Sequence, residues 1–211
     1  MNKNINILKP DDIKEELINA IRTHSLIPII GSGFSAGLKA FSGEVTSGNI
    51  YKADMISILK ETNQFSEEEI QEIESYSFSK VSSIYEDDFY VKPEKRFEYM
   101  KNHFYKVTLP ELDCRRIVGE IDWPYIYTLN IDDCIERNTV FKKVILPNRE
   151  IIVDSFIDEK CVIKLHGDIG EIVSYRDAKK VFTSREYSLS INNNAELLYK
   201  FKNDMLNQNV V

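Results

Sequence analysis

The chain has 211 residues, and 43% of them are hydrophobic, enough for one sizeable core in a single domain or in a domain with an inserted subdomain. It carries 27 basic and 34 acidic residues, a formal net charge of −7, which argues against direct binding of duplex DNA because that needs a basic face. Three widely spaced cysteines give neither a disulfide framework nor a zinc site and indicate reduced thiols of a cytoplasmic protein. We expect no secretory signal, because the N-terminal residues hold no apolar h-region, and no membrane contact, because the sequence has no apolar run of about 18 residues.

The first elements are a helix and a short apolar strand. Residues 11–24 predict a helix, since apolar side chains recur at the spacing of one buried stripe. Residues 26–30, LIPII, predict a strand buried on both faces, although Pro28 would remove one hydrogen bond of the ladder. Residues 36–50 are rich in glycine and serine and predict a mobile loop.

The next part of the chain, residues 50–107, is predicted to be mostly helical. Ser66 followed by Glu69 is typical of a capping box at a helix start, and residues 93–107 place apolar side chains on one face. The segment holds no motif that names a chemistry. We interpret it as a helical insertion that caps a functional site, with plain scaffold as the alternative.

Strands and helices alternate in the remaining sequence. Residues 123–133, WPYIYTLNIDD, predict a strand that ends near Asn130, and residues 132–141 predict a helix. Three further strands and a long helix follow. Their predicted positions are 143–147, 150–156 and 161–168 for the strands and 184–206 for the helix, in which an asparagine run is a weak point.

This alternation predicts an α/β fold with a Rossmann-like parallel sheet flanked by helices, its core formed by residues 26–49 and 108–211. Ligands of such sheets bind outside the carboxyl ends of the strands. Three predicted strands end there in polar or glycine-rich segments, so we expect these segments to meet. They are Gly31-Ser32-Gly33, Asn130 with Asp132, and His166 with Gly167.

Each segment has a plain structural interpretation as well as a functional one. Gly31 and Gly33 suit a backbone that approaches a phosphate, with a helix N-terminus behind them, yet they lack the third glycine of a dinucleotide fingerprint and a Walker lysine. Asn130 suits a ribose hydroxyl or a carboxamide, or a helix cap. His166 suits a general base, or a buried core histidine.

Taken in this order, the three segments resemble the motifs of the sirtuin family, which binds NAD in a Rossmann-like domain. The family's motifs are G-A-G-x-S, T-x-N-x-D and H-G. The matching residues are Gly31, Ser32, Gly33, Phe34 and Ser35 for the first motif, Thr128, Asn130 and Asp132 for the second, and His166 and Gly167 for the third.

The chain also departs from the protein deacylases of that family. No cysteine follows Cys161, so the four-cysteine zinc module is missing, and residues 37–43 replace the usual G-I-P-D-F-R segment. What remains resembles the zinc-free sirtuin-like domains of bacterial antiphage defence proteins, which hydrolyse NAD and so abort infection. The resemblance implies an NAD hydrolase without a metal. The alternative is a catalytically silent module that senses NAD or ADP-ribose, and NAD-dependent protein deacylation ranks below both.

The resemblance also implies roles for the matched residues. The glycine turn binds the pyrophosphate, and Ser32 and Phe34 border the nicotinamide ribose. Asn130 and His166 are the catalytic residues, while Asp132 supports the loop or the nicotinamide pocket. We further expect a homo-oligomer, and a phage protein or a C-terminal sensor domain as the trigger, with the 211 residues forming the N-terminal part of a longer protein.

Overall fold

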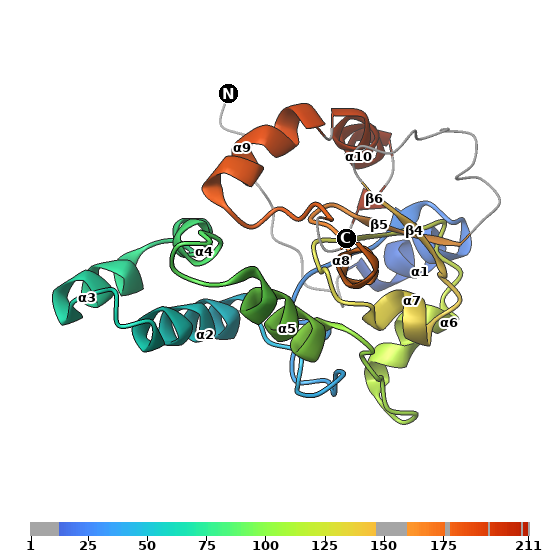
Figure 1. Ribbon diagram of the computed structural model, residues 1–211. Helices are drawn as coiled ribbons and strands as arrows, with labels where there is room; N and C mark the ends of the chain where they lie inside the picture. The colour runs from blue at the N-terminus through green and yellow to red at the C-terminus, as the bar shows by residue number, and fades with distance from the viewer. Residues whose placement is uncertain (1–12, 147–159, 176–177, 194, 208, 211) are drawn as a thin grey trace.

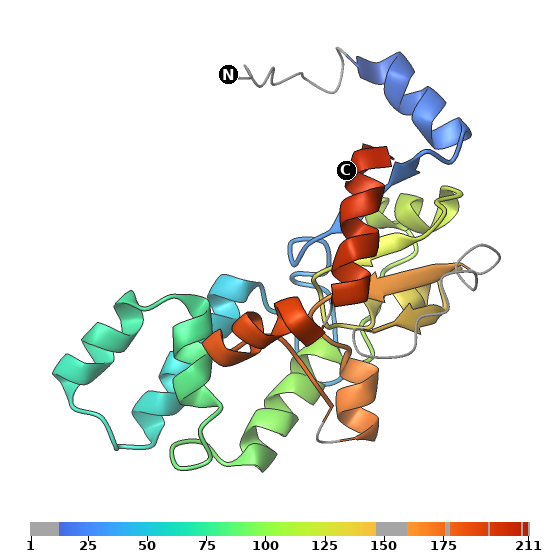
Figure 2. The same cartoon turned by 90° about the horizontal axis from the view of Figure 1, so that it is seen from above.

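The computed structural model of the protein describes residues 13–146, 160–175, 178–193, 195–207 and 209–210. Its centre is a parallel sheet with helices on both faces (Figures 1 and 2). The sheet has the spatial order β2-β3-β5-β4. Strands β1 and β6 form a second sheet of two parallel strands. The strands are β1 (Leu26–Ile27), β2 (Ile29–Ile30), β3 (Ile126–Thr128), β4 (Lys143–Ile145), β5 (Cys161–Lys164) and β6 (Asn209–Val210). The prediction of a Rossmann-like α/β fold is therefore confirmed.

Pro28 divides the predicted strand 26–30 into two. The residues before it pair with β6, and those after it pair with β3. A proline has no N–H to donate to a ladder, but its carbonyl still accepts a hydrogen bond of 3.0 Å from the Tyr127 N–H. The predicted strand 150–156 lies outside the described residues.

The two faces of the sheet bury alternate residues, as a strand period of two requires. Tyr127 and Ile163 pack on the face that α10 (Ala195–Asn207) covers with Leu197. Ile126 and Val162 pack on the opposite face, against α1 (Lys14–Arg22), α6 (Ile117–Glu120) and α7 (Cys134–Asn138). The other helices around the sheet are α8 (Ile169–Ser174) and α9 (Ser184–Asn193).

Four helices between β2 and β3 form a unit at one side of the sheet, where Figure 1 shows α3 farthest from the strands. They are α2 (Gly48–Glu61), α3 (Glu67–Ser75), α4 (Phe78–Tyr85) and α5 (Pro93–Phe104). The predicted capping box is present, because Ser66 and Glu69 bond each other's backbone N–H groups. The predicted helical character of this segment is confirmed.

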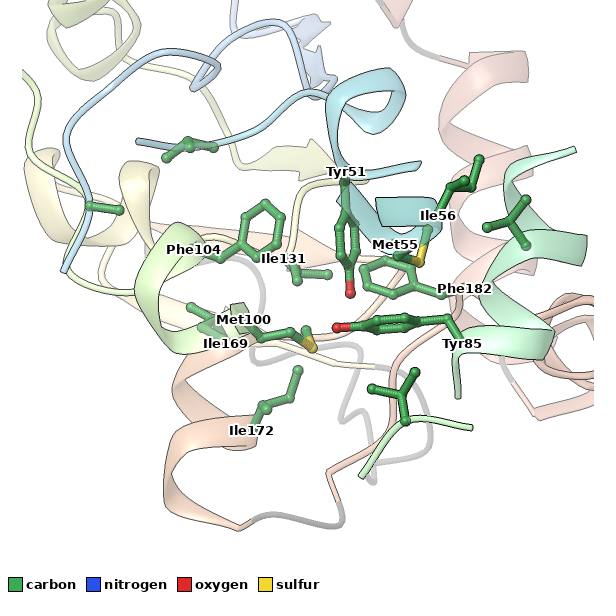
Figure 3. Close-up of a cluster of buried hydrophobic side chains, with 14 of the residues drawn as sticks. Tyr51, Met55, Ile56, Tyr85, Met100, Phe104, Ile131, Ile169, Ile172 and Phe182 are labelled. Atoms are coloured by element: carbon green, nitrogen blue, oxygen red, sulfur yellow. The ribbon is translucent and has the colours of Figure 1, made fainter. Parts of the chain in front are cut away.

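A large apolar cluster joins this helical unit to α8 and to the segment after β3 (Figure 3). Tyr51 and Met55 of α2, Met100 of α5 and Ile169 of α8 are among its buried members. Since α8 and the segment after β3 contribute side chains to the same cluster, the helical unit shares its core with the strand ends.

Three sequence expectations about elements need correction. The loop predicted over 36–50 is shorter, because α2 begins at Gly48 after its N-cap Ser47. Two side chains of this loop, Leu38 and Val45, are buried in the core. The helix predicted over 184–206 is two helices, α9 and α10, separated at the asparagine run. The short helix α8 was not predicted. Within the described residues, no helix is long and apolar enough to cross a membrane.

Candidate functional site

The carboxyl ends of three adjacent strands place the predicted site segments at one edge of the sheet. Ile30 pairs with Thr128, and Thr128 pairs with Lys164. The glycine turn follows directly after Ile30, and Asn130 and His166 each lie two residues after their paired position. The register of the sheet thus brings the three segments to the edge where parallel sheets bind ligands.

The glycine turn differs from the expectation in two respects. Gly37 and Gly167 are the described glycines with positive φ, so Gly31 and Gly33 do not use that freedom. No helix begins behind the turn, because residues 32–37 are turns, and the next helix of the described chain starts at Gly48. A Cβ added to Gly31 or Gly33 would meet nothing within 4 Å. The turn therefore offers open space beside its backbone, and not an aligned helix dipole.

A buried hydrogen-bond network joins the glycine turn to the segment after β3. The Ser35 hydroxyl donates to the Asp132 carboxylate at 2.6 Å and accepts from the Asn130 amide at 3.1 Å. The Thr128 hydroxyl donates to the Ile30 carbonyl at 2.9 Å and accepts from the Asn130 N–H at 3.0 Å. The structure thus brings Ser35, Thr128, Asn130 and Asp132 together.

Two groups of this network are buried in a way that costs free energy: the Asp132 carboxyl and the Asn130 side-chain oxygen. Burial raises the pKa of Asp132, while hydrogen bonds from Ser35 and from the Cys134 N–H act in the opposite direction. The carbonyl oxygen of the Asn130 side chain is buried and has no hydrogen-bond partner among the described residues. A buried acceptor without a partner is costly, so a ligand or water donor at this oxygen would be favoured.

A pocket lies between this network and the helical unit. Ser32, Ser35, Asn130 and Asp132 supply its polar side. The remaining lining is mainly apolar and comes from the helical unit and three nearby segments: Val45, Thr46, Gly48, Tyr51, Phe78, Phe104, Leu129, Ile131 and Phe182. Its volume is about 80 Å³, smaller than the several hundred Å³ typical of pockets that enclose a whole ligand. It can hold one ring of a ligand whose remainder lies outside.

His166 lies at the same sheet edge but is not one of the described residues that line this pocket. Its ring packs edge-on against the Tyr187 ring, with 5.5 Å between the centroids. Burial lowers the pKa of His166, so the imidazole is neutral at pH 7. Gly167 is required by the backbone: its φ is +107°, and an added Cβ would lie 2.6 Å from the Lys179 carbonyl oxygen.

Phe34 also lies away from the pocket lining, and its position depends on an arginine that the sequence analysis missed. The Phe34 ring packs against both neighbouring apolar clusters. Its carbonyl accepts a hydrogen bond of 2.8 Å from Arg115, which also holds Asp113 through both carboxylate oxygens. Arg115 is thus a cation at the glycine turn, and no local sequence pattern announces it.

The segment after β3 is also fixed by residues that sequence analysis did not single out. Asp133 accepts hydrogen bonds from the N–H groups of Lys106 and Val107, at 2.8 and 2.7 Å, and so ties the end of the helical unit to this segment. The aspartate pair in TLNIDD was the available signal. The Lys164 ammonium group also donates hydrogen bonds to two backbone carbonyls of this segment, although Lys164 occupies an otherwise apolar strand.

Comparisons with known proteins add no family to this description. No family model matches the chain, and no curated protein matches it. In the described part of the chain, no group of three or more His, Cys, Asp or Glu side chains is arranged to hold a metal ion.

Proposed function

We propose that the protein is an NAD glycohydrolase that cleaves NAD to nicotinamide and ADP-ribose. The observation that carries the proposal is the Ser35–Asn130–Asp132 network at the wall of an otherwise apolar pocket. This network joins two of the three segments that resemble sirtuin motifs. A flat ring with an amide substituent matches such a pocket, because aromatic side chains pack on the ring and polar groups bind the amide.

In this proposal, the nicotinamide ring occupies the pocket and the rest of the dinucleotide runs along the strand ends. The open space beside Gly31 and Gly33 accommodates the pyrophosphate. Gly167 allows the tight backbone conformation after His166, and the Thr128 hydroxyl holds the Asn130 backbone by accepting a hydrogen bond from its N–H group. The unpartnered Asn130 oxygen accepts a hydrogen bond from a ribose hydroxyl, from the attacking water or from the carboxamide.

The reaction breaks the bond between the nicotinamide nitrogen and the anomeric carbon of the ribose. Nicotinamide leaves with the bonding electron pair, and because its ring nitrogen is already cationic, it needs little acid assistance. Water attacks the anomeric carbon, and its proton passes to His166, which burial keeps neutral. Positioning and stabilisation of the oxocarbenium-like centre supply most of the rate enhancement.

The test is incubation of the protein with NAD and detection of nicotinamide by chromatography. Asn130→Ala and His166→Ala should each reduce the rate on the order of a hundredfold or more. The matched control is His103→Ala, since His103 lies in α5 and bonds the Glu44 carbonyl at 2.8 Å. Parent-like hydrolysis by His166→Ala would remove that residue from the mechanism.

The second candidate is a module that binds NAD or ADP-ribose without turning it over. The observation that favours it is that His166 is not among the described residues that line the pocket. The proposed general base and the Ser35–Asn130–Asp132 network therefore do not line the same pocket. Calorimetry that shows binding, together with chromatography that shows no nicotinamide, would support this candidate. In either case, we propose a role in antiphage defence, with control by oligomerisation or by a further domain.

A further inference from the structure

Lys164 is a fully buried cation in the central strand β5, with 0% of its side chain exposed. Its ammonium group bonds the Asp168 carboxylate at 2.5 Å and the Glu136 carboxylate at 2.5 Å. It also donates to the backbone carbonyls of Ile131 at 3.3 Å and Asp132 at 2.7 Å. A buried ammonium is tolerated only when it is paired in this way, so the position of Lys164 is narrowly fixed.

The two carbonyls belong to the segment that carries the polar side of the pocket. Asn130 immediately precedes Ile131, and the Asp132 side chain accepts the Ser35 hydroxyl. The carbonyl of Ile131 also accepts the Ile169 N–H at 2.8 Å, so β5 and α8 both hold the segment. Lys164 is not among the described residues that line the pocket. It touches the backbone behind the polar side chains, not the space in front of them.

We propose that Lys164 is the positioning residue of this site: its ammonium group fixes the backbone at residues 131 and 132 so that Asn130 and Asp132 face the ligand. The inference rests on the proposed function for the identity of that ligand. The ion pairs anchor the ammonium group at α7 through Glu136 and at the start of α8 through Asp168. The hydrogen bonds to the two carbonyls transmit that fixed position to the site.

The test compares amide hydrogen exchange and NAD hydrolysis in a charge-removing variant. Lys164→Met alone would leave two buried carboxylates without a cation, so it is combined with Glu136→Gln. Asp168 keeps its 3.0 Å hydrogen bond from the Glu171 N–H. The control is Lys200→Met, which removes a mostly buried lysine that pairs with Asp204 on α10.

In the double variant, we expect exchange across residues 129–134 to accelerate at least tenfold. The Asp133 and Cys134 N–H groups report this directly, because they bond the Phe104 carbonyl and the Asp132 carboxylate. Exchange in α3 should stay at the parent rate, and kcat for NAD should fall at least tenfold. Lys200→Met should change neither quantity.

The two readouts separate failure of this inference from failure of the proposed function. If the parent protein neither binds nor hydrolyses NAD, the proposed function is wrong, and hydrogen exchange alone decides the role of Lys164. Parent-like exchange across residues 129–134 in the double variant would overturn the positioning role. If that variant does not fold, Lys164→Arg decides by the same measurements, because it keeps the charge but replaces a compact ammonium group with a planar fork.

Discussion

At the scale of single residues, Ser35 is the central member of the polar network. Its hydroxyl donates a hydrogen bond to the Asp132 carboxylate and accepts one from the Asn130 side-chain amide. Ser35→Ala should lower the free energy of unfolding by about 1–3 kcal/mol, since it leaves a buried carboxylate and a buried amide each short of a partner. Urea unfolding measures this change.

The matched control for that substitution is Ser82→Ala. Ser82 is equally buried, but its hydroxyl has a single weak contact, 3.7 Å to the Met55 sulfur. Its replacement should change stability by well under half as much. Equal losses in the two variants would mean that the Ser35 hydrogen bonds contribute no more than ordinary buried packing.

At the scale of elements, the two glycine-containing segments make different demands on their glycines. Gly33→Ala should leave stability within about 0.5 kcal/mol of the parent, because the added Cβ meets nothing within 4 Å. It should weaken NAD binding at least tenfold, because the methyl group occupies the space proposed for the pyrophosphate. Calorimetry and urea unfolding of the same samples give both quantities.

Gly167→Ala is the opposite case and serves as the comparison. Its positive φ and the short approach to the Lys179 carbonyl make an alanine strained in the absence of any ligand. We expect a stability loss of about 1–3 kcal/mol. If Gly33→Ala destabilised the protein as much as Gly167→Ala, the glycine turn would be required by the fold rather than by a ligand.

The element scale also shows what the sequence could predict. Strand and helix patterns predicted the parallel α/β architecture, because apolar runs and capping residues act locally, as at Ser66. They did not predict the division at Pro28, because a strand partner on each side is a tertiary property. The phosphate-binding interpretation of Gly31 and Gly33 expected a helix N-terminus behind the turn, and the structure has none there, because residues 32–37 are turns.

The pocket depends more strongly on contacts distant in sequence. Ser35, Asn130 and Asp132 were predictable as candidates, since they follow apolar strands of a parallel sheet. Tyr51 and Phe182 form the opposite wall, but each is separated from these residues by long stretches of chain and resembles any other core aromatic. The role of Lys164 was not predicted, because a single lysine in an apolar strand forms no sequence pattern that indicates its two carboxylate and two backbone carbonyl partners.

At the scale of the whole molecule, the buried cluster around Lys164 couples protonation to global stability. The Glu136 carboxylate lies next to two charged groups: Lys164, which belongs to β5, and Asp168, which precedes α8. Its second carboxylate oxygen has no hydrogen-bond partner among the described residues. Burial raises its pKa from 4.5 to about 7, in spite of the opposing effect of Lys164. The folded state therefore holds a proton that the unfolded state releases at lower pH.

The free energy of unfolding should consequently fall as pH rises from about 4.5 to 7, because only the unfolded chain has already ionised this carboxyl. The loss should be about 3 kcal/mol, because each pKa unit corresponds to about 1.4 kcal/mol, and it should be complete above pH 8. Asp132 and Asp133, whose pKa values burial also raises, add to this slope, while His166, whose pKa burial lowers, opposes it as pH falls below its usual value of 6.5. The parent protein alone therefore cannot isolate Glu136.

Glu136→Gln isolates it, because the amide oxygen still accepts from Lys164 while the titration disappears. Urea unfolding of parent and variant at pH 5, 6, 7 and 8 should give a stability difference that changes across this range in favour of the variant. All other titrating groups are common to both proteins, so their effects largely cancel in the difference. A difference that stays constant from pH 5 to 8 would mean that Glu136 is already ionised throughout, held so by Lys164.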